Sequence, residues 1–268
     1  MKHYDNHEYE IRLNNEGYSL IAGTDEVGRG PLAGPVVAAC VIMPKDCYIE
    51  GVTDSKKISE KNRKLLKTEI EKQAIAYKVI FIDPKKIDEI NIYEASRLAM
   101  TTAINELSVK PDYVLADAMP LHIDIPTEAI IKGDEKSFTI ACASILAKVA
   151  RDDYMVELDK LYPEYGFAKH KGYPTKQHLA AICEYGILDK HHRKSYAPVQ
   201  NEALKGNYNQ KEKEKGSKWA FFWFFLKYYL INLLVNSKII VKKVLFWYYH
   251  FLMIIQYSKF HQDFHINM

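Results

Sequence analysis

Cysteine is scarce in this chain of 268 residues, which contains only Cys40, Cys47, Cys142 and Cys183. The four are scattered and show no paired spacing of the kind that holds a metal ion. Cys40 and Cys142 lie within runs of apolar or small residues, so we expect both to be buried thiols. This usage is typical of a reducing compartment, and we expect a cytoplasmic protein.

The chain also lacks an apolar secretory signal at its start, an internal repeat and a basic main body. Residues 1–17 are polar and charged. The formal net charge is +3, but nine lysines and only three acids lie from Gly206 onward, so residues 1–205 carry a balance of −3. A polyanionic partner would therefore be bound by local basic loops or through metal ions on carboxylates.

Changes in composition divide the chain into four parts. We predict an N-terminal extension over residues 1–17, a main α/β domain over 18–200, a polar lysine-rich linker over 201–218 and an apolar, aromatic tail over 219–268. The main domain is punctuated by turn residues and caps, whereas the tail consists largely of Phe, Tyr, Ile, Leu, Lys and Asn. The two regions therefore need separate explanations.

The tail is open to three interpretations. Its first apolar run, Trp219–Val235, contains Lys227 and Asn232 and is at the lower limit of length for a membrane span. Lysines then interrupt it, and the second run, residues 244–255, is too short to span. The tail could be a marginal membrane anchor, a pair of amphipathic helices, or an aberrant C-terminus of the composition that translated AT-rich DNA would give.

Hydrophobic patterning in the main domain predicts alternating strands and helices. Apolar runs and alternation predict strands over residues 18–27, 35–43, 75–82, 113–117 and 129–132. Caps, apolar stripes and breakers predict helices over residues 59–73, 91–107, 136–162 and 174–185. This order of elements is typical of an α/β fold.

Four acids share one local context, because each follows a short apolar strand or closes a turn. They are Asp25, Glu26, Asp117 and Asp134. Carboxylates at the ends of neighbouring strands can converge, and such a cluster needs cations because like charges raise each other's pKa. Mg²⁺ and Mn²⁺ accept oxygen ligands, and two ions about 3.5–4 Å apart can promote phosphodiester cleavage. The alternative is that these acids are ordinary turn or cap residues.

A Gly28-Arg29-Gly30 turn follows the first two acids directly. Glycine lets another backbone or a ligand approach closely, and an arginine can bind a phosphate with two parallel hydrogen bonds. The alternative for Arg29 is a salt bridge that braces the turn. Acids followed by such a turn are a plausible way to place metal ligands beside a phosphate-binding loop.

The chain resembles the ribonuclease HII family over about Tyr18–Val199. The motifs that carry the resemblance are Asp25-Glu26-Val27-Gly28-Arg29-Gly30-Pro31-Leu32-Ala33-Gly34-Pro35-Val36, Asp54-Ser55-Lys56-Lys57, Asn91-Ile92 with Ala99-Met100, Lys132-Gly133-Asp134, Ser144-Ile145-Leu146-Ala147-Lys148-Val149 with Arg151-Asp152, Gly172-Tyr173-Pro174-Thr175, and His192-Arg193. Their order and rough spacing also agree with the family. The tail after Lys205 has no counterpart in this pattern.

The resemblance implies an RNase H-like fold, with a mixed central sheet flanked by helices and a small helical C-terminal portion. It implies an endoribonuclease that cuts the RNA strand of RNA–DNA hybrids and incises at single ribonucleotides embedded in duplex DNA. The products would carry 5′-phosphate and 3′-hydroxyl ends. We expect a monomer that requires Mn²⁺ or Mg²⁺, with no small-molecule cofactor. Membrane contact would come only from the tail and is not the favoured interpretation.

The resemblance also implies roles for individual residues. Asp25, Glu26 and Asp117 would be metal ligands, and Asp134 would be the fourth catalytic acid. The backbone of the Gly28-Arg29-Gly30 turn would contact a ribose 2′-hydroxyl, the group that distinguishes RNA from DNA. The ring of Tyr173 would stack on the deoxyribose after the ribonucleotide. Phosphate contacts that position the duplex without reading its sequence would come from Ser55, Lys56 and Lys148.

Two other classes of function remain as alternatives. A hybrid-binding or membrane-tethered adaptor would bind without cleaving, and a glycosidase with two catalytic carboxylates would work without metal. Zinc is a weaker possibility, because the spacing of His170, His178, His191 and His192 fits no tight site.

Overall fold

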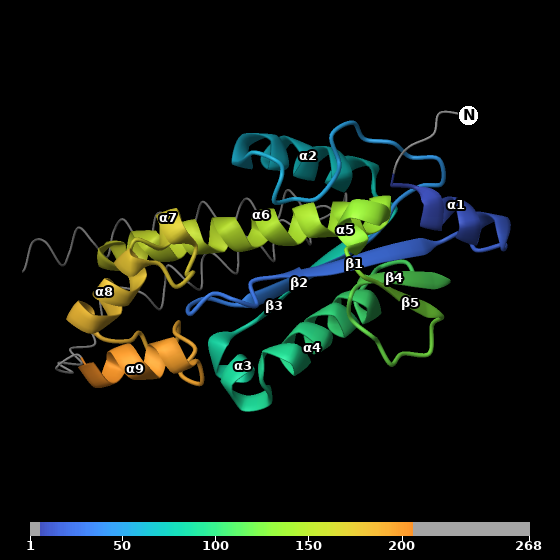
Figure 1. Ribbon diagram of the computed structural model, residues 1–268. Coiled ribbons are helices and arrows are strands. Elements are labelled where there is room, and N and C mark those ends of the chain that lie inside the picture. The colour runs from blue at the N-terminus through green and yellow to red at the C-terminus, as the bar shows by residue number, and fades with distance from the viewer. Residues whose placement is uncertain (1–5, 206–268) are drawn as a thin grey trace, which may run out of the picture. The chain divides into compact units, whose positions relative to one another are not determined.

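The computed structural model describes residues 6–205, in which helices cover both faces of a five-stranded sheet (Figure 1). The strands are β1 (Ile21–Val27), β2 (Val36–Ile42), β3 (Ala76–Ile82), β4 (Tyr113–Asp117) and β5 (Thr127–Ile130). Their order across the sheet is β3-β2-β1-β4-β5. Strands β1, β2 and β3 pair antiparallel, whereas β4 runs parallel to β1 and β5 parallel to β4. The expected mixed sheet is confirmed.

Helices account for most of the remaining described chain. They are α1 (Glu8–Asn15), α2 (Glu60–Gln73), α3 (Pro84–Ile90), α4 (Ile92–Asn105), α5 (Gly133–Lys136), α6 (Phe138–Leu161), the 3₁₀ turn η1 (Pro163–Tyr165), α7 (Phe167–His170), α8 (Lys176–Tyr185) and α9 (Ala197–Lys205). The side chains of Ser59 and Asn91 cap α2 and α4 as predicted, and Gly186 ends α8 with a φ of 85°.

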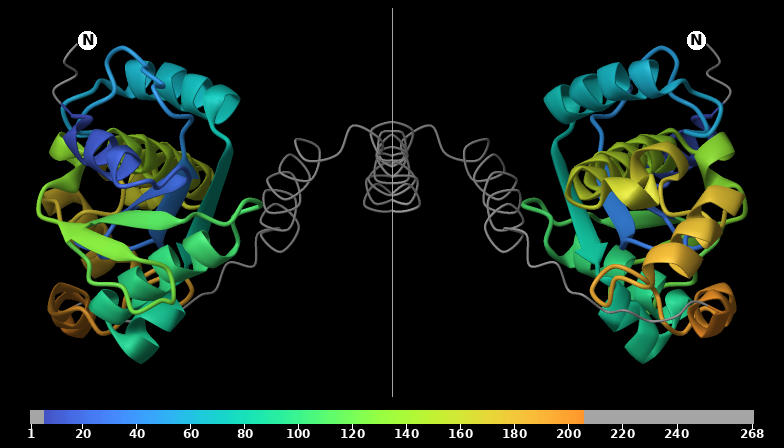
Figure 2. Two further views of the ribbon diagram at one scale, coloured as in Figure 1. Left: turned by 90° about the vertical axis from the view of Figure 1, so that its right-hand side faces the viewer. Right: turned by 90° about the vertical axis from the view of Figure 1, so that its left-hand side faces the viewer.

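The sheet separates two helical layers, with α6 and α2 on one face and α4 on the other (Figure 2). Small residues allow α6 to approach the sheet closely. A Cβ atom built on Gly23 of β1 would lie 2.2 Å from the backbone of Thr139, so only glycine fits beneath the first turn of α6. This contact fixes the distance between β1 and α6, the two elements that carry much of the candidate site.

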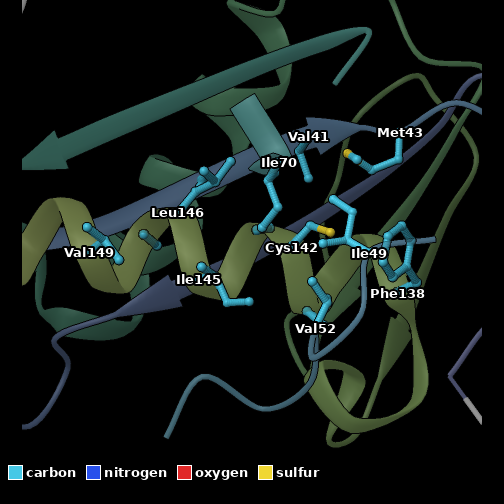
Figure 3. Close-up of a cluster of buried hydrophobic side chains, with 14 of the residues drawn as sticks. Val41, Met43, Ile49, Val52, Ile70, Phe138, Cys142, Ile145, Leu146 and Val149 are labelled. Carbon is cyan, nitrogen blue, oxygen red and sulfur yellow. The ribbon is translucent and has the colours of Figure 1, made fainter. Parts of the chain in front are cut away.

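The larger apolar cluster lies between β2, α2 and α6 (Figure 3). Ile70 of α2 and Leu146 of α6 are among its buried side chains, together with Val41 of β2. Cys142 is buried in the same cluster and Cys40 in the layer on the opposite face, which confirms both as buried thiols. Burial of apolar area of this kind stabilises the domain by about 25 cal/mol per Å².

Two parts of the fold differ from the sequence-based boundaries. Residues 8–15 of the expected extension form α1, whose Leu13 is fully buried against the sheet. Residues 201–205, which composition assigns to the linker, continue α9. Helices α7, α8 and α9 are the expected small helical C-terminal portion, and they enclose an apolar cluster of Leu32, Ile182 and Val199.

The linker beyond residue 205 and the tail lie outside the described residues, so their three interpretations remain predictions. Between residues 6 and 205, no helix combines the length and apolarity that a bilayer-crossing segment needs.

Candidate active site

Strand register brings the first two carboxylates together. The parallel pairing of β1 with β4 matches Thr24 with Ala116, and the next residue on each strand is an aspartate. Asp25 and Asp117 therefore leave the same edge of the sheet from neighbouring strands. Glu26 follows Asp25 while β1 is still paired with β2, since Glu26 lies opposite Ala38. β1 continues through the pair and ends at Val27, which is the predicted end of this strand.

Asp134 reaches the same edge through the turn that follows β5. The backbone N–H of Gly133 donates a 2.6 Å hydrogen bond to Oδ1 of Asp117, which ties this turn to the end of β4. Two left-handed residues bend the chain here, Ala118 with a φ of 48° and Lys132 with a φ of 57°. Such conformations cost about 1–3 kcal/mol each and concentrate at functional sites.

Burial and neighbouring carboxylates perturb Asp25, Glu26 and Asp134. Burial raises the pKa of Asp25 well above its usual range, and the charges of Glu26, Asp117 and Asp134 raise it further. Burial also raises the pKa of Glu26, to about 7. The pKa of Asp134 rises because of burial and repulsion by Asp117. Titratable groups of this kind, desolvated and held close to like charges, are typical of functional sites.

The donor set suits a hard divalent cation. Oε2 of Glu26 is buried and has no hydrogen-bond partner among the described residues. Its other oxygen lies 3.3 Å from Nη1 of Arg29, and Oδ2 of Asp134 lies 3.7 Å from Nζ of Lys56. Within residues 6–205, no three His, Cys, Asp or Glu side chains already form a complete metal cage. Repelled carboxylates with an unpartnered buried oxygen nevertheless fit an ion that accepts several oxygen ligands.

The Gly28-Arg29-Gly30 turn lies directly beside the carboxylates. Arg29 makes the salt bridge to Glu26 that was the alternative to phosphate binding, but its side chain is about half exposed. Gly28 has a φ of 97°, and a Cβ atom there would lie 2.3 Å from Nε of Arg151. At Gly30 the nearest neighbour of such an atom would be Cε1 of Tyr173, at 3.6 Å. Gly28 therefore leaves room for Arg151 inside the domain, whereas Gly30 faces outward toward the ring of Tyr173.

Two buried arginines hold this turn from inside. Arg193 donates to the carbonyl oxygens of Gly28 at 2.6 Å and of Arg29 at 2.9 Å, and also binds the carbonyl of Gly34. Arg151 donates to the carbonyls of Ala33, Pro35 and Lys171 at 3.0–3.1 Å. Both guanidinium groups are fully buried. Each bond to a charged donor contributes about 1.5–3 kcal/mol.

Tyr173 projects from the turn between α7 and α8, and 41% of its surface is exposed. A chain of histidines holds the turn. Leu188 N–H donates to Nδ1 of His192, so Nε2 of that ring carries the proton shared with Nε2 of His178. Nδ1 of His178 then donates to the carbonyl of Tyr173. His178 and His192 are thus neutral rings whose nitrogens all take part in hydrogen bonds within the fold.

The remaining predicted contacts are spread around the carboxylates. Oγ of Ser55 lies 2.9 Å from Oγ of Ser144, which in turn hydrogen-bonds Asp25. Lys56 is largely exposed and faces Asp134. Lys148 is mostly buried and donates a 2.6 Å bond to Asp152. Its predicted phosphate contact therefore competes with an internal ion pair.

Sequence reasoning missed the internal supports of the site. Arg151 and Arg193 were identified only as parts of motifs. Their hydrogen bonds to backbone carbonyls could not be predicted, because the carbonyls lie 20–165 residues away along the chain. Glu10 of α1 was also missed. Its Oε1 accepts from Ser137 Oγ and from the backbone and hydroxyl of Thr139, and so caps α6 from a distant part of the chain. The only available signals were the position of Arg151 after the apolar first half of α6 and that of Arg193 after a histidine pair.

Comparisons with known proteins agree with this geometry. The family described as Ribonuclease HII matches residues 22–199. Ribonuclease HII of Bacillus cytotoxicus is 55% identical over 194 residues, which is 72% of this chain and 74% of that protein. The crystal structure of ribonuclease H2 from Pyrococcus horikoshii has a TM-score of 0.60 and 27% identity, covering 69% of this chain and 97% of that one.

A more distant structure shares the fold. Bst-RNase HIII, solved in complex with Mn²⁺, has a TM-score of 0.55 at 15% identity, covering 76% of this chain and 75% of that one. The family match spans well over half of the chain, and the expected RNase H-like fold is confirmed. The protein described above therefore belongs to the ribonuclease HII family of hydrolytic ribonucleases.

Proposed function

We propose that this protein is an endoribonuclease that cuts the RNA strand of RNA–DNA hybrids and incises at single ribonucleotides in duplex DNA. Its products would carry 5′-phosphate and 3′-hydroxyl ends. The observation that carries the proposal is the convergence of four carboxylates beside the Gly28-Arg29-Gly30 turn, where burial and neighbouring charges raise the pKa values of Asp25, Glu26 and Asp134. Membership of the ribonuclease HII family supports the same substrate class.

Asp25, Glu26 and Asp117 would hold the metal, with Asp134 as the fourth acid. Carboxylate oxygens favour Mg²⁺ and Mn²⁺, and a protein of the same fold has been solved with Mn²⁺. When bound, two such ions activate a water molecule and stabilise the oxygen that leaves the phosphorus. The unpartnered oxygen of Glu26 and the raised pKa of Asp25 are the features of this chain that favour such binding.

The protein's own groups would position the substrate. The half-exposed guanidinium of Arg29 and the exposed ammonium of Lys56 flank the acids and suit contacts with neighbouring phosphates. The backbone of the turn would accept or donate to the ribose 2′-hydroxyl. Tyr173 lies next to Gly30, and we assign its ring to the deoxyribose that follows the ribonucleotide, as the family resemblance implies.

The test uses labelled duplexes that differ at one position. With Mn²⁺ or Mg²⁺, we expect cleavage of a DNA duplex that contains one ribonucleotide and of an RNA–DNA hybrid, and none of the all-DNA duplex. The Asp117→Asn variant should lose this cleavage and remain folded. Cleavage of all-DNA duplex at a similar rate would refute ribose selectivity, and unchanged cleavage by Asp117→Asn would remove that acid from the mechanism. Activity that resists a chelator would favour the metal-free glycosidase alternative.

A further inference from the structure

Arg193 is a buried cation whose partners in the described chain are carbonyl and hydroxyl oxygens. Its side chain is fully buried, and it makes no ion pair with any carboxylate between residues 6 and 205. Burial lowers its pKa, and yet arginine stays charged at physiological pH. Burying a charge costs free energy unless hydrogen bonds compensate it, so the oxygens that bind Arg193 are needed to keep this cation inside the domain.

Two bonds of Arg193 fall on consecutive peptide groups of the turn, and its others go to the carbonyl of Gly34 and the hydroxyl of Tyr196. Nη2 donates to the carbonyl oxygen of Gly28 at 2.6 Å, and Nη1 donates to that of Arg29 at 2.9 Å. The N–H groups of these same peptide units belong to Arg29 and Gly30. In a trans peptide the N–H points away from the C=O, so carbonyls held inward leave the N–H groups outward.

These two N–H groups are available to a ligand. Among the described residues, neither the N–H of Arg29 nor that of Gly30 has a protein acceptor. The carbonyl of Arg29 also accepts a 2.7 Å bond from Oη of Tyr196, which in turn accepts from Arg193. Hydrogen bonds in a chain polarise one another, so a carbonyl bound to a guanidinium makes its own N–H a stronger donor.

We propose that Arg193 is a positioning residue for ribose recognition: its guanidinium holds two carbonyls inward, so that the N–H groups of Arg29 and Gly30 face outward as strong donors to a 2′-hydroxyl oxygen. Tyr196 supports the second of these carbonyls. The inference rests on the proposed function, because it explains how the proposed substrate is told from DNA. It adds that discrimination depends on a charge that never touches the nucleic acid.

The geometry separates Arg193 from its neighbour Arg151. The carbonyls that Arg151 binds belong to Ala33, Pro35 and Lys171. None of these is a carbonyl of the Gly28-Arg29 or Arg29-Gly30 peptide groups. Arg151 therefore braces the loop as a whole, whereas Arg193, with support from Tyr196, orients the two donors.

The experiment measures a ratio, the Kd for an all-DNA duplex divided by the Kd for the same duplex with one ribonucleotide. Arg193→Lys keeps the charge and loses the planar fork that reaches both carbonyls. We expect this ratio to fall about three- to tenfold, the equivalent of one ordinary hydrogen bond. KM for the single-ribonucleotide duplex should rise by a similar factor while kcat changes less, which a merely destabilised enzyme would not show.

Two further variants complete the test. Tyr196→Phe keeps the packing of the ring and removes only the hydroxyl, with its bond to the Arg29 carbonyl and the bond that it accepts from Arg193, so the ratio should fall about two- to threefold. Lys194→Ala is the matched control. It removes a positive charge one residue away, from a half-exposed side chain paired with Asp189, and should leave the ratio unchanged.

The possible results distinguish a failure of the proposed function from a failure of the role assigned to Arg193. A wild-type ratio of one overturns the proposed function and this inference with it. A wild-type preference that persists unchanged in folded Arg193→Lys overturns only the role of Arg193. Should that variant be unfolded at the assay temperature, Tyr196→Phe decides: a reduced ratio supports the role, and the wild-type ratio overturns it.

Discussion

Replacing each of the two glycines of the turn by alanine should separate stability from substrate binding. Gly28 has a φ of 97°, where an L residue costs about 1–2 kcal/mol. Its new Cβ would lie 2.3 Å from Nε and 2.6 Å from Cδ of Arg151, and 2.9 Å from the Pro35 carbonyl. Arg151 cannot move away without losing hydrogen bonds worth about 1.5–3 kcal/mol each.

Gly28→Ala should therefore lower the free energy of unfolding by about 3–4 kcal/mol. For a domain of this size that corresponds to a fall in Tm of about 10 °C. Gly30→Ala should behave oppositely, since its φ lies outside the left-handed region and its nearest neighbour would be an ordinary contact of 3.6 Å. We expect its Tm to be unchanged or slightly raised, because alanine reduces the freedom of the unfolded chain.

The functional effects should be reversed. The methyl group of Gly30→Ala would project from the turn where the ribose is proposed to bind, toward Tyr173, and should lower kcat/KM on a single-ribonucleotide duplex by about 10- to 100-fold. Thermal melting by circular dichroism and a gel cleavage assay measure the two effects on the same samples. A Gly28→Ala protein as stable as wild type would refute the steric argument. A fully active Gly30→Ala protein would refute the placement of the ribose.

Three further predictions concern charge and pH. Because burial raises the pKa of Glu26 to about 7, the binding of a cation should release a proton. Titration calorimetry should therefore show an affinity for Mn²⁺ that rises from pH 6 to 7 and levels above pH 7, and an affinity independent of pH would contradict this prediction. Glu10→Ala removes the hydrogen-bond acceptor at the start of α6 and should lower the free energy of unfolding in urea by about 3 kcal/mol. The control Glu16→Ala changes an exposed side chain and should lower it by less than about 0.5 kcal/mol, and equal effects would exclude the capping role of Glu10. Burial lowers the pKa of His178 to about 4, so the unfolded chain takes up the proton first as pH falls below about 6.5. The free energy of unfolding should therefore fall between pH 7 and 5 by about 2 kcal/mol more in the wild-type protein than in His178→Asn. Equal falls in the two proteins would show that His178 does not cause this pH dependence.

Local sequence signals were sufficient where an element depends on its own residues. The strand over residues 113–117 has the predicted bounds, and the caps at Ser59 and Asn91 were correctly identified. The prediction for β5 was two residues late, because the apolar Ile131 suggested a strand although it is 74% exposed in the turn before Lys132. Helix α1 was missed because its sequence is largely polar, and its main anchors are contacts with distant residues.

In the candidate site, too, the features that depend on local sequence could be predicted, whereas those that depend on distant contacts could not. Its acids could be selected from the sequence because each follows a short apolar run or closes a turn, and the register between β1 and β4 then explains why Asp25 and Asp117 meet. The roles of Arg151 and Arg193 could not be predicted in this way. Both act through backbone carbonyls, which carry no sequence signal, and both bridge segments that are far apart along the chain.

The central claim is that four acids from three parts of the chain hold divalent cations at the edge of the sheet. Anomalous diffraction at the manganese edge, from crystals of the protein soaked in Mn²⁺, tests it directly. We predict anomalous peaks between the carboxylates of Asp25, Glu26, Asp117 and Asp134, which disappear in Asp117→Asn or lose occupancy there. A catalytically active crystal with manganese bound elsewhere, and none among these carboxylates, would contradict the account.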